Sequence, residues 1–204
     1  MNISTARIMR KIIHKLKDPK ILVSLFLAGI MIFSTLGFML DYQTGNSNKR
    51  KYNGYKFEQM YDGIQTKING QKFTLTHFPE QLEYISMSTE IKQILRNTQV
   101  LAITYNPESE YKEAFAEQQF NLAEDLSQIN KYILAGMTNN TNFEQIPQIT
   151  CQNATSTLPV IQFREAITTS ITLKNNCITI NIGNVNDASQ TGDLLFYQIA
   201  GIME

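Results

Sequence analysis

The sequence has little of several residue types that define special classes of protein. Two cysteines among 204 residues are too few for a disulfide-dense mini-protein or a four-ligand zinc finger. Ten glycines and five prolines exclude a Gly- or Pro-rich linker protein. A charged fraction of 18% beside a hydrophobic fraction of 43% excludes a disordered or coiled-coil chain. What remains is a chain long enough to bury the core of one or two globular domains.

Charge is absent from one continuous stretch, residues 21–40, in which fifteen of the twenty residues are Ile, Leu, Val, Met, Phe or Ala. A helix of this length spans about 30 Å, which matches the hydrocarbon core of a bilayer. The run is longer than the apolar part of a secretory signal, and no Ala-x-Ala cleavage pattern follows it. The sequence therefore predicts an uncleaved, single-pass transmembrane helix, with the lipid bilayer as the partner of residues 21–40.

The two flanks of this stretch carry opposite charge. Residues 1–20 contain six basic residues and one acidic residue, whereas residues 41–204 contain twelve basic and seventeen acidic residues. The formal net charge of zero is thus the sum of +5 and −5. Because basic flanks stay on the cytoplasmic side, residues 1–20 are predicted to be a cytoplasmic segment and the C-terminal part extracytoplasmic. Lys49, Arg50 and Lys51 weaken this contrast but do not reverse it.

The rest of the chain is predicted to be a linker, residues 41–51, and one α/β domain, residues 52–204. Tyr52–Gln59 has the composition of a strand. Asn69-Gly70 lies between two β-rich runs, Ile64–Ile68 and Gln71–Phe78, and this pair favours a tight hairpin turn. Thr89–Asn97 is a predicted short helix, with Ser88 as its cap.

The second half of the domain alternates strands and helices. Val100–Tyr105 is a nearly continuous apolar run, typical of a strand buried on both faces. Asn106-Pro107 is predicted to open a helix to about Asn130, and Tyr132–Met137 then pairs in parallel with the first strand through a right-handed crossover. Further strands are predicted at Leu158–Arg164, Ser170–Leu173 and Cys177–Ile182, before a final helix at Gln190–Met203. The fold class is therefore α/β, with a central mixed sheet and flanking helices.

From Val100 onward, about half of the chain, this order resembles the thioredoxin fold. In that family a strand leads into Cys-x-x-Cys at the head of a helix, and a proline opens a later strand that faces the motif. Here Pro159 takes the place of the proline, but the motif reads Asn106-Pro107-Glu108-Ser109. The thiolate that would be the nucleophile is missing, so the dithiol chemistry is not carried over. The resemblance concerns fold more than function.

In overall pattern the chain also resembles uncharacterised archaeal single-span membrane proteins. The shared segments are Tyr52-Asn53-Gly54-Tyr55, Thr150-Cys151-Gln152-Asn153-Ala154-Thr155 and Asn175-Asn176-Cys177-Ile178. This resemblance implies no activity.

Cys151 and Cys177 are 26 positions apart, which fits no local zinc-ligand spacing. Outside the cytoplasm disulfides persist, so a structural disulfide between them is the favoured interpretation. A redox-active pair and two unpaired thiols are the alternatives. Two glycosylation sequons, at Asn139 and Asn153, mark a surface loop.

No residue pattern assigns catalysis, a cofactor or a metal. His77 is the single histidine of the domain, and it lacks a nucleophile elbow or a His-Glu-x-x-His pair. The sequence has no Gly-rich phosphate loop, and the acidic balance of the domain disfavours nucleic acid. The predicted function is a membrane-anchored extracytoplasmic binding or assembly module of the cell envelope, which acts on a protein partner or as a homo-oligomer. A thioredoxin-like enzyme with a degenerate site around Asn106–Ser109 and Pro159 is the alternative, and a purely structural module is a third reading.

Overall fold

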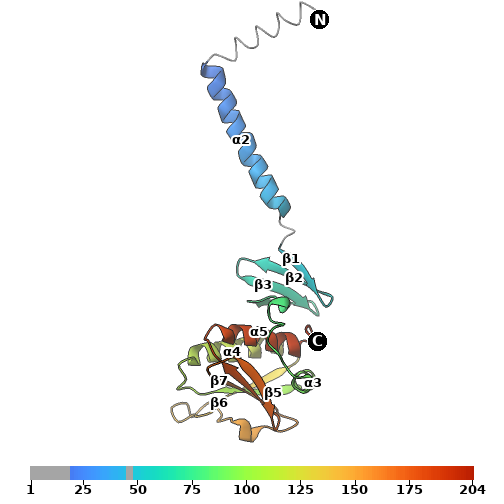
Figure 1. Ribbon diagram of the computed structural model, residues 1–204, viewed down its shortest axis with the longest axis vertical. Coiled ribbons are helices and arrows are strands. Elements are labelled where there is room, and N and C mark those ends of the chain that lie inside the picture. The colour runs from blue at the N-terminus through green and yellow to red at the C-terminus, as the bar shows by residue number, and fades with distance from the viewer. Residues whose placement is uncertain (1–18, 45–47) are drawn as a thin grey trace, which may run out of the picture. The chain divides into compact units, whose positions relative to one another are not determined.

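The computed structural model describes residues 19–44 and 48–204 (Figure 1). The chain divides into two compact units, with the boundary between Asn48 and Lys49. The first unit contains helix α2, Pro19–Thr44. The second unit, Lys49–Glu204, contains two β-sheets and the remaining helices of the described chain.

Helix α2 covers the predicted membrane span, residues 21–40. Within residues 19–44 and 48–204, no helix combines the length and the apolar character needed to cross a bilayer, so this part of the predicted fold is wrong. Five positions of the apolar run are Ser, Thr or Gly, and α2 continues beyond it through the polar segment Asp41–Thr44. Residues 1–18, most of the predicted basic segment, and residues 45–47 of the predicted linker lie outside the described residues.

The first sheet is a four-stranded antiparallel meander. Its strands are β1 (Lys49–Tyr52), β2 (Tyr55–Met60), β3 (Gly63–Ile68) and β4 (Gln71–Leu75). Two-residue turns join them at residues 53–54, 61–62 and 69–70. Both Asn-Gly turns have positive φ at their two residues, as tight hairpin turns require. The predicted single strand Tyr52–Gln59 is therefore a hairpin, because the Asn53-Gly54 turn interrupts it.

The second sheet has the order β6-β5-β7-β9-β8. β5 (Val100–Tyr105), β6 (Tyr132–Met137), β7 (Val160–Glu165) and β9 (Cys177–Ile182) are parallel neighbours, and β8 (Ser170–Lys174) pairs antiparallel with β9 at the edge. As predicted, the β5–β6 pair is parallel and a helix joins the two strands. The domain thus has two sheets where the sequence predicts one central sheet.

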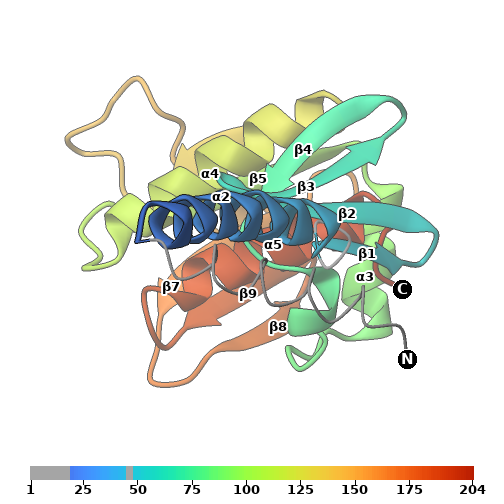
Figure 2. The ribbon, with the colours of Figure 1, turned by 90° about the horizontal axis from the view of Figure 1, so that it is seen from above.

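Three helices complete the domain, and the last of them packs against both sheets. These are α3 (Thr89–Asn97), α4 (Lys112–Ser127) and α5 (Asp187–Ile199), and Figure 2 shows α4 and α5 next to each other. From α5, Tyr197 meets the Phe57 ring of β2 at 5.8 Å and Phe196 meets the Phe73 ring of β4 at 5.1 Å between centroids. Burial of α5 on nearly all sides explains why its sequence is apolar around most of its circumference.

Helix α4 begins five residues later than Pro107, where the sequence predicts its first turn. Asn106 instead closes a local turn, in which its side-chain oxygen accepts from the Glu108 amide at 3.1 Å and its carbonyl from the Ser109 amide at 3.0 Å. The amide of Tyr111 is then shared between the Ser109 hydroxyl and the Glu165 carboxylate, each at 3.1 Å. The local turn and this tertiary contact, which connects residues 54 positions apart, together precede the start of α4.

Candidate anion-binding face

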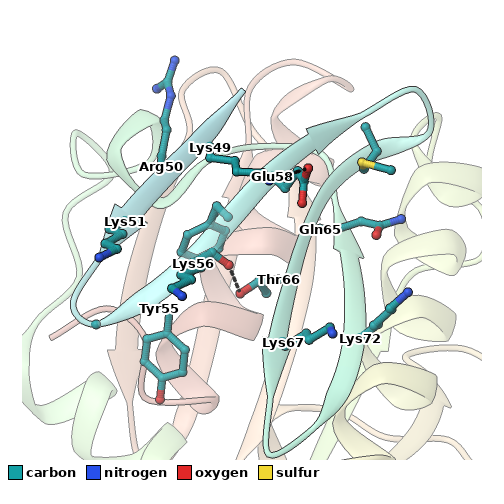
Figure 3. Close-up of a pocket in the computed structure, with 13 residues that line it drawn as sticks. Lys49, Arg50, Lys51, Tyr55, Lys56, Glu58, Gln65, Thr66, Lys67 and Lys72 are labelled. Carbon is teal, nitrogen blue, oxygen red and sulfur yellow. Dashed lines mark hydrogen bonds and ion pairs between the residues drawn. The ribbon is translucent and has the colours of Figure 1, made fainter. Parts of the chain in front are cut away.

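Four lysines form a row across all four strands of the meander. The strand register places Lys51 of β1 opposite Lys56 of β2, and Lys67 of β3 opposite Lys72 of β4. Continuing the β2–β3 register by one residue places Lys56 opposite Lys67. All four side chains are exposed, on the face of the sheet opposite to the buried Phe57 and Phe73. Figure 3 labels the four lysines on their strands. We call Lys51, Lys56, Lys67 and Lys72 the lysine row.

The dimensions of the lysine row follow from β-sheet geometry. Neighbouring strands lie about 4.8 Å apart, so the row extends about 14 Å across the sheet. Directly opposed like charges destabilise a sheet, which makes three consecutive Lys–Lys juxtapositions costly to the fold. Within residues 19–44 and 48–204, no carboxylate lies within ion-pair distance of these four ammonium groups.

The adjacent row of the same face is mixed rather than basic. It consists of Lys49, Glu58, Gln65 and Thr74, in strand order. Lys49 and Glu58 form an ion pair of 3.5 Å between exposed side chains. Arg50 belongs to the other face, where its guanidinium carbon lies 4.2 Å from the centre of the Phe78 ring. The free positive charge of the outer face is therefore carried by lysines.

This face is hollowed into an open groove of about 1040 Å³. The lysine row, Lys49 and Glu58 line it on this face, and Met60 is the exposed apolar side chain in its lining. Met60 is 45% exposed, so a large flexible apolar side chain is accessible beside the charges. The groove thus combines a positive row with an adaptable apolar contact.

Charge is segregated between this sheet and the rest of the domain. Residues 49–72 contain six Lys or Arg and two Asp or Glu, a net charge of +4. Residues 73–204 contain six Lys or Arg and fourteen Asp or Glu, a net charge of −8. The net negative charge of the whole domain, which disfavours nucleic acid, is therefore not shared by the face of the lysine row. At this face the local electrostatic field attracts anions.

No family model, curated protein or solved structure matches this chain. The site is therefore defined by its geometry alone. The resemblances to thioredoxin and to archaeal membrane proteins stay predictions.

The two cysteines are bonded to each other, with Cα atoms 5.2 Å apart. Cys151 begins the short helix η2 (Cys151–Asn153), and Cys177 is the buried first residue of β9. The bond fixes the long connection between β6 and β7 against the sheet face that the helices leave open, where Ile149 and Val160 are buried beside Cys177. Neither sulfur is a free thiol in this state.

Both predicted glycosylation sites lie on this β6–β7 connection. The side-chain oxygen of Asn139 accepts from the Thr141 amide at 3.1 Å and the Thr141 hydroxyl at 2.6 Å. Asn153 is exposed, and its side-chain oxygen accepts from the Thr150 amide at 2.8 Å. Modification of the two asparagines stays a prediction.

His77 has structural partners in the described chain. Its Nδ1 lies 2.8 Å from Oδ2 of Asp193 on α5, and the same oxygen accepts from the amides of Thr76 at 3.0 Å and His77 at 2.8 Å. Tyr197 donates its hydroxyl to the His77 carbonyl at 2.6 Å. These contacts attach the segment that follows β4 to α5.

The two segments on which the thioredoxin resemblance depends do not meet. Asn106–Ser109 follows the C-terminal end of β5, whereas Pro159 precedes the N-terminal end of β7. Because β5 and β7 are parallel, with Ala102 opposite Val160, the segments lie at opposite ends of the sheet. At the first end, Ser109 donates its hydroxyl to Glu165, and this bond lowers the pKa of that carboxyl.

A smaller acidic cavity of about 190 Å³ lies among β4, α4 and α5. Its carboxylates are Glu117, Asp125 and Asp193. Burial, together with the charges of Glu124 and Asp193, raises the pKa of Asp125 to about 6. Among the residues that the structure describes, no three His, Cys, Asp or Glu side chains are arranged to hold a metal ion.

The lysine row was not predicted from the sequence, although part of its geometry is encoded in the two Asn-Gly turns. Asn53-Gly54 and Asn69-Gly70 are both hairpin pairs, and a two-residue turn sets the register of the strands beside it. The first turn places Lys51 opposite Lys56, and the second places Lys67 opposite Lys72. Only the β2–β3 register, which aligns the two pairs into one row, required the structure.

Proposed function

We propose that residues 49–204 form a binding module that recognises an acidic protein partner through the lysine row. The observation that carries this proposal is the alignment of four exposed lysines on four adjacent strands. Such a row destabilises the sheet by itself, and an acidic partner would relieve the repulsion.

The chemistry of the row favours carboxylates over sequence-specific phosphate recognition. An ammonium group is a mobile point charge, whereas planar bidentate recognition of phosphate is a property of arginine. The single arginine of the four strands, Arg50, is directed toward Phe78 rather than toward the outer face. A salt-sensitive surface of lysines suits an extended set of carboxylates on a partner protein.

The disulfide supports a second part of the proposal, that the module works in an oxidising compartment. A bond between residues 26 positions apart persists where the thiol pool does not reduce it. The binding role and the compartment are independent claims.

The binding role is tested with fluorescently labelled poly-L-glutamate and the full-length protein. We expect binding that weakens as salt is raised, and an affinity at least tenfold lower for the double variant Lys67→Gln/Lys72→Gln. The matched control is Lys174→Gln, which removes an exposed lysine from β8 in the other sheet. Equal affinity of wild type and double variant would overturn the proposal. Tighter binding to single-stranded DNA than to polyglutamate would replace the acidic protein with nucleic acid.

A further inference from the structure

An acidic stripe with an aromatic residue at its centre lies on the exposed side of helix α4. Glu113, Glu117, Phe120 and Glu124 are all exposed, and Phe120 is 66% exposed. At 100° per residue, their spacings of four, three and four residues place them within about 60° of each other around the helix. We call these four residues the α4 stripe.

The opposite side of α4 is the one that packs into the domain. Phe115, Gln118, Leu122 and Leu126 are its buried residues. The α4 stripe is exposed on the other side of the helix, and its Glu117 also lines the acidic cavity. An exposed phenylalanine among glutamates is a composition typical of an interface anchor with a charged surround.

The α4 stripe and the lysine row are complementary in length, charge and chemistry. From Glu113 to Glu124 the stripe measures about 16 Å along the helix axis, and the lysine row measures about 14 Å. Three carboxylates would face four ammonium groups. Phe120 would reach the apolar part of the groove, where the flexible thioether of Met60 is 45% exposed and packs well on an aromatic ring.

We propose that the acidic partner of the lysine row is the α4 stripe of a second copy of this chain. This inference rests on the proposed function and deepens it, since it names the partner. The segregation of charge, +4 in residues 49–72 and −8 in residues 73–204, gives every copy one basic surface and one acidic surface. The two surfaces differ, so the contact is heterologous and builds a closed ring or an open chain of subunits.

Charge reversal on each surface tests the inference with the full-length protein. The row variant is Lys67→Glu/Lys72→Glu, the stripe variant is Glu113→Lys/Glu117→Lys, and the swap variant combines all four substitutions. Sedimentation velocity at low salt measures association. We expect wild type to associate as concentration rises, each double variant alone to associate at least tenfold more weakly, and the swap variant to recover association. An equimolar mixture of the two double variants should also associate, because each supplies the surface that the other lacks.

Two controls separate the inference from its alternatives. The substitutions Glu144→Lys and Lys174→Glu reverse exposed charges outside both surfaces and should leave association unchanged. The variant Phe120→Ala, which removes the aromatic residue of the α4 stripe, should weaken association. Wild type that stays monomeric at low salt, or a swap variant and a mixture that fail to associate, would overturn the inference. If polyglutamate still binds the lysine row in that case, the proposed function stands with a different acidic protein as partner. If polyglutamate does not bind either, both fail.

Discussion

Lys67 and Lys72 lie directly opposite each other on β3 and β4, next to the turn at Asn69-Gly70. Two like charges at opposed positions of an antiparallel pair destabilise it by roughly 0.2–1 kcal/mol. The pair is also the end of the lysine row, so folding and binding place opposite demands on the same two side chains.

This conflict predicts that Lys67→Gln raises stability while it lowers affinity. We expect the free energy of unfolding to rise by about 0.2–1 kcal/mol, because one member of a repelling pair is neutralised. Urea denaturation measures the stability, and polyglutamate titration measures the affinity. Lys174→Gln should change neither. A variant that loses stability and affinity together would show that Lys67 supports the fold rather than a partner.

The bond between Tyr197 and the His77 carbonyl predicts a loss of stability in Tyr197→Phe. The variant leaves the carbonyl without this donor, at a cost of about 1 kcal/mol in the free energy of unfolding. Burial, with the charges of Asp193 and Glu80, raises the pKa of the Tyr197 hydroxyl, so it stays a donor at every pH at which the protein is studied. Tyr61→Phe, at a fully exposed site, is the control. An equal change in the free energy of unfolding for the two variants would contradict a stabilising role for the Tyr197 hydrogen bond.

Loss of the disulfide should lower stability more than loss of the Tyr197 hydroxyl does. Cys151→Ser/Cys177→Ser should lower the free energy of unfolding by about 3 kcal/mol, since the bond closes a loop across 26 positions. Wild type in reductant should reach the same value in the same denaturation experiment. Binding of polyglutamate should persist in both as long as the domain is folded, because the bond is in the other sheet. Unchanged stability in reductant would show that the bond does not constrain the chain.

The acidic cavity predicts a pH dependence. The raised pKa of Asp125, about 6 against about 4 in the unfolded chain, means that the folded state favours the protonated form. Its contribution to stability is fully present below about pH 4 and is lost as pH rises through about 6. Asp125→Asn should therefore gain stability relative to wild type between these values, on the order of 1 kcal/mol after allowance for solvent screening.

Urea denaturation at pH 4, 5, 6 and 7 measures this difference, with the exposed Glu144→Gln as control. A constant difference between Asp125→Asn and wild type over this range would contradict the assignment.

Local signals in the sequence predict much of the second sheet. Thr89–Asn97 with its Ser88 cap, Val100–Tyr105 and Tyr132–Met137 have the predicted bounds, because capping and apolar runs act within a few residues. The start of α4 escaped prediction because the Tyr111 amide is shared between the Ser109 hydroxyl and Glu165, which lies far along the chain. The separation into two sheets depends on how α5 packs between them, which no local pattern specifies.

Of the candidate site, only the two pairs of opposed lysines can be predicted from the sequence. Hairpin turns define Lys51 with Lys56 and Lys67 with Lys72, but their alignment into one row depends on the β2–β3 register. The complementary α4 stripe is readable as an amphipathic helix, and an acidic outer side is the ordinary property of such a helix. The α4 stripe becomes a candidate binding surface only because the same chain also carries the basic groove.

Lysine footprinting tests the central claim most directly. Full-length protein is acetylated in the presence and absence of poly-L-glutamate at low salt, and mass spectrometry measures the modification of each lysine. Lys51, Lys56, Lys67 and Lys72 should be protected by the acidic polymer, while the exposed Lys112 and Lys174 should react as they do in the free protein. Protection spread evenly over all exposed lysines, or confined to residues outside the row, would contradict recognition of an acidic partner by this face.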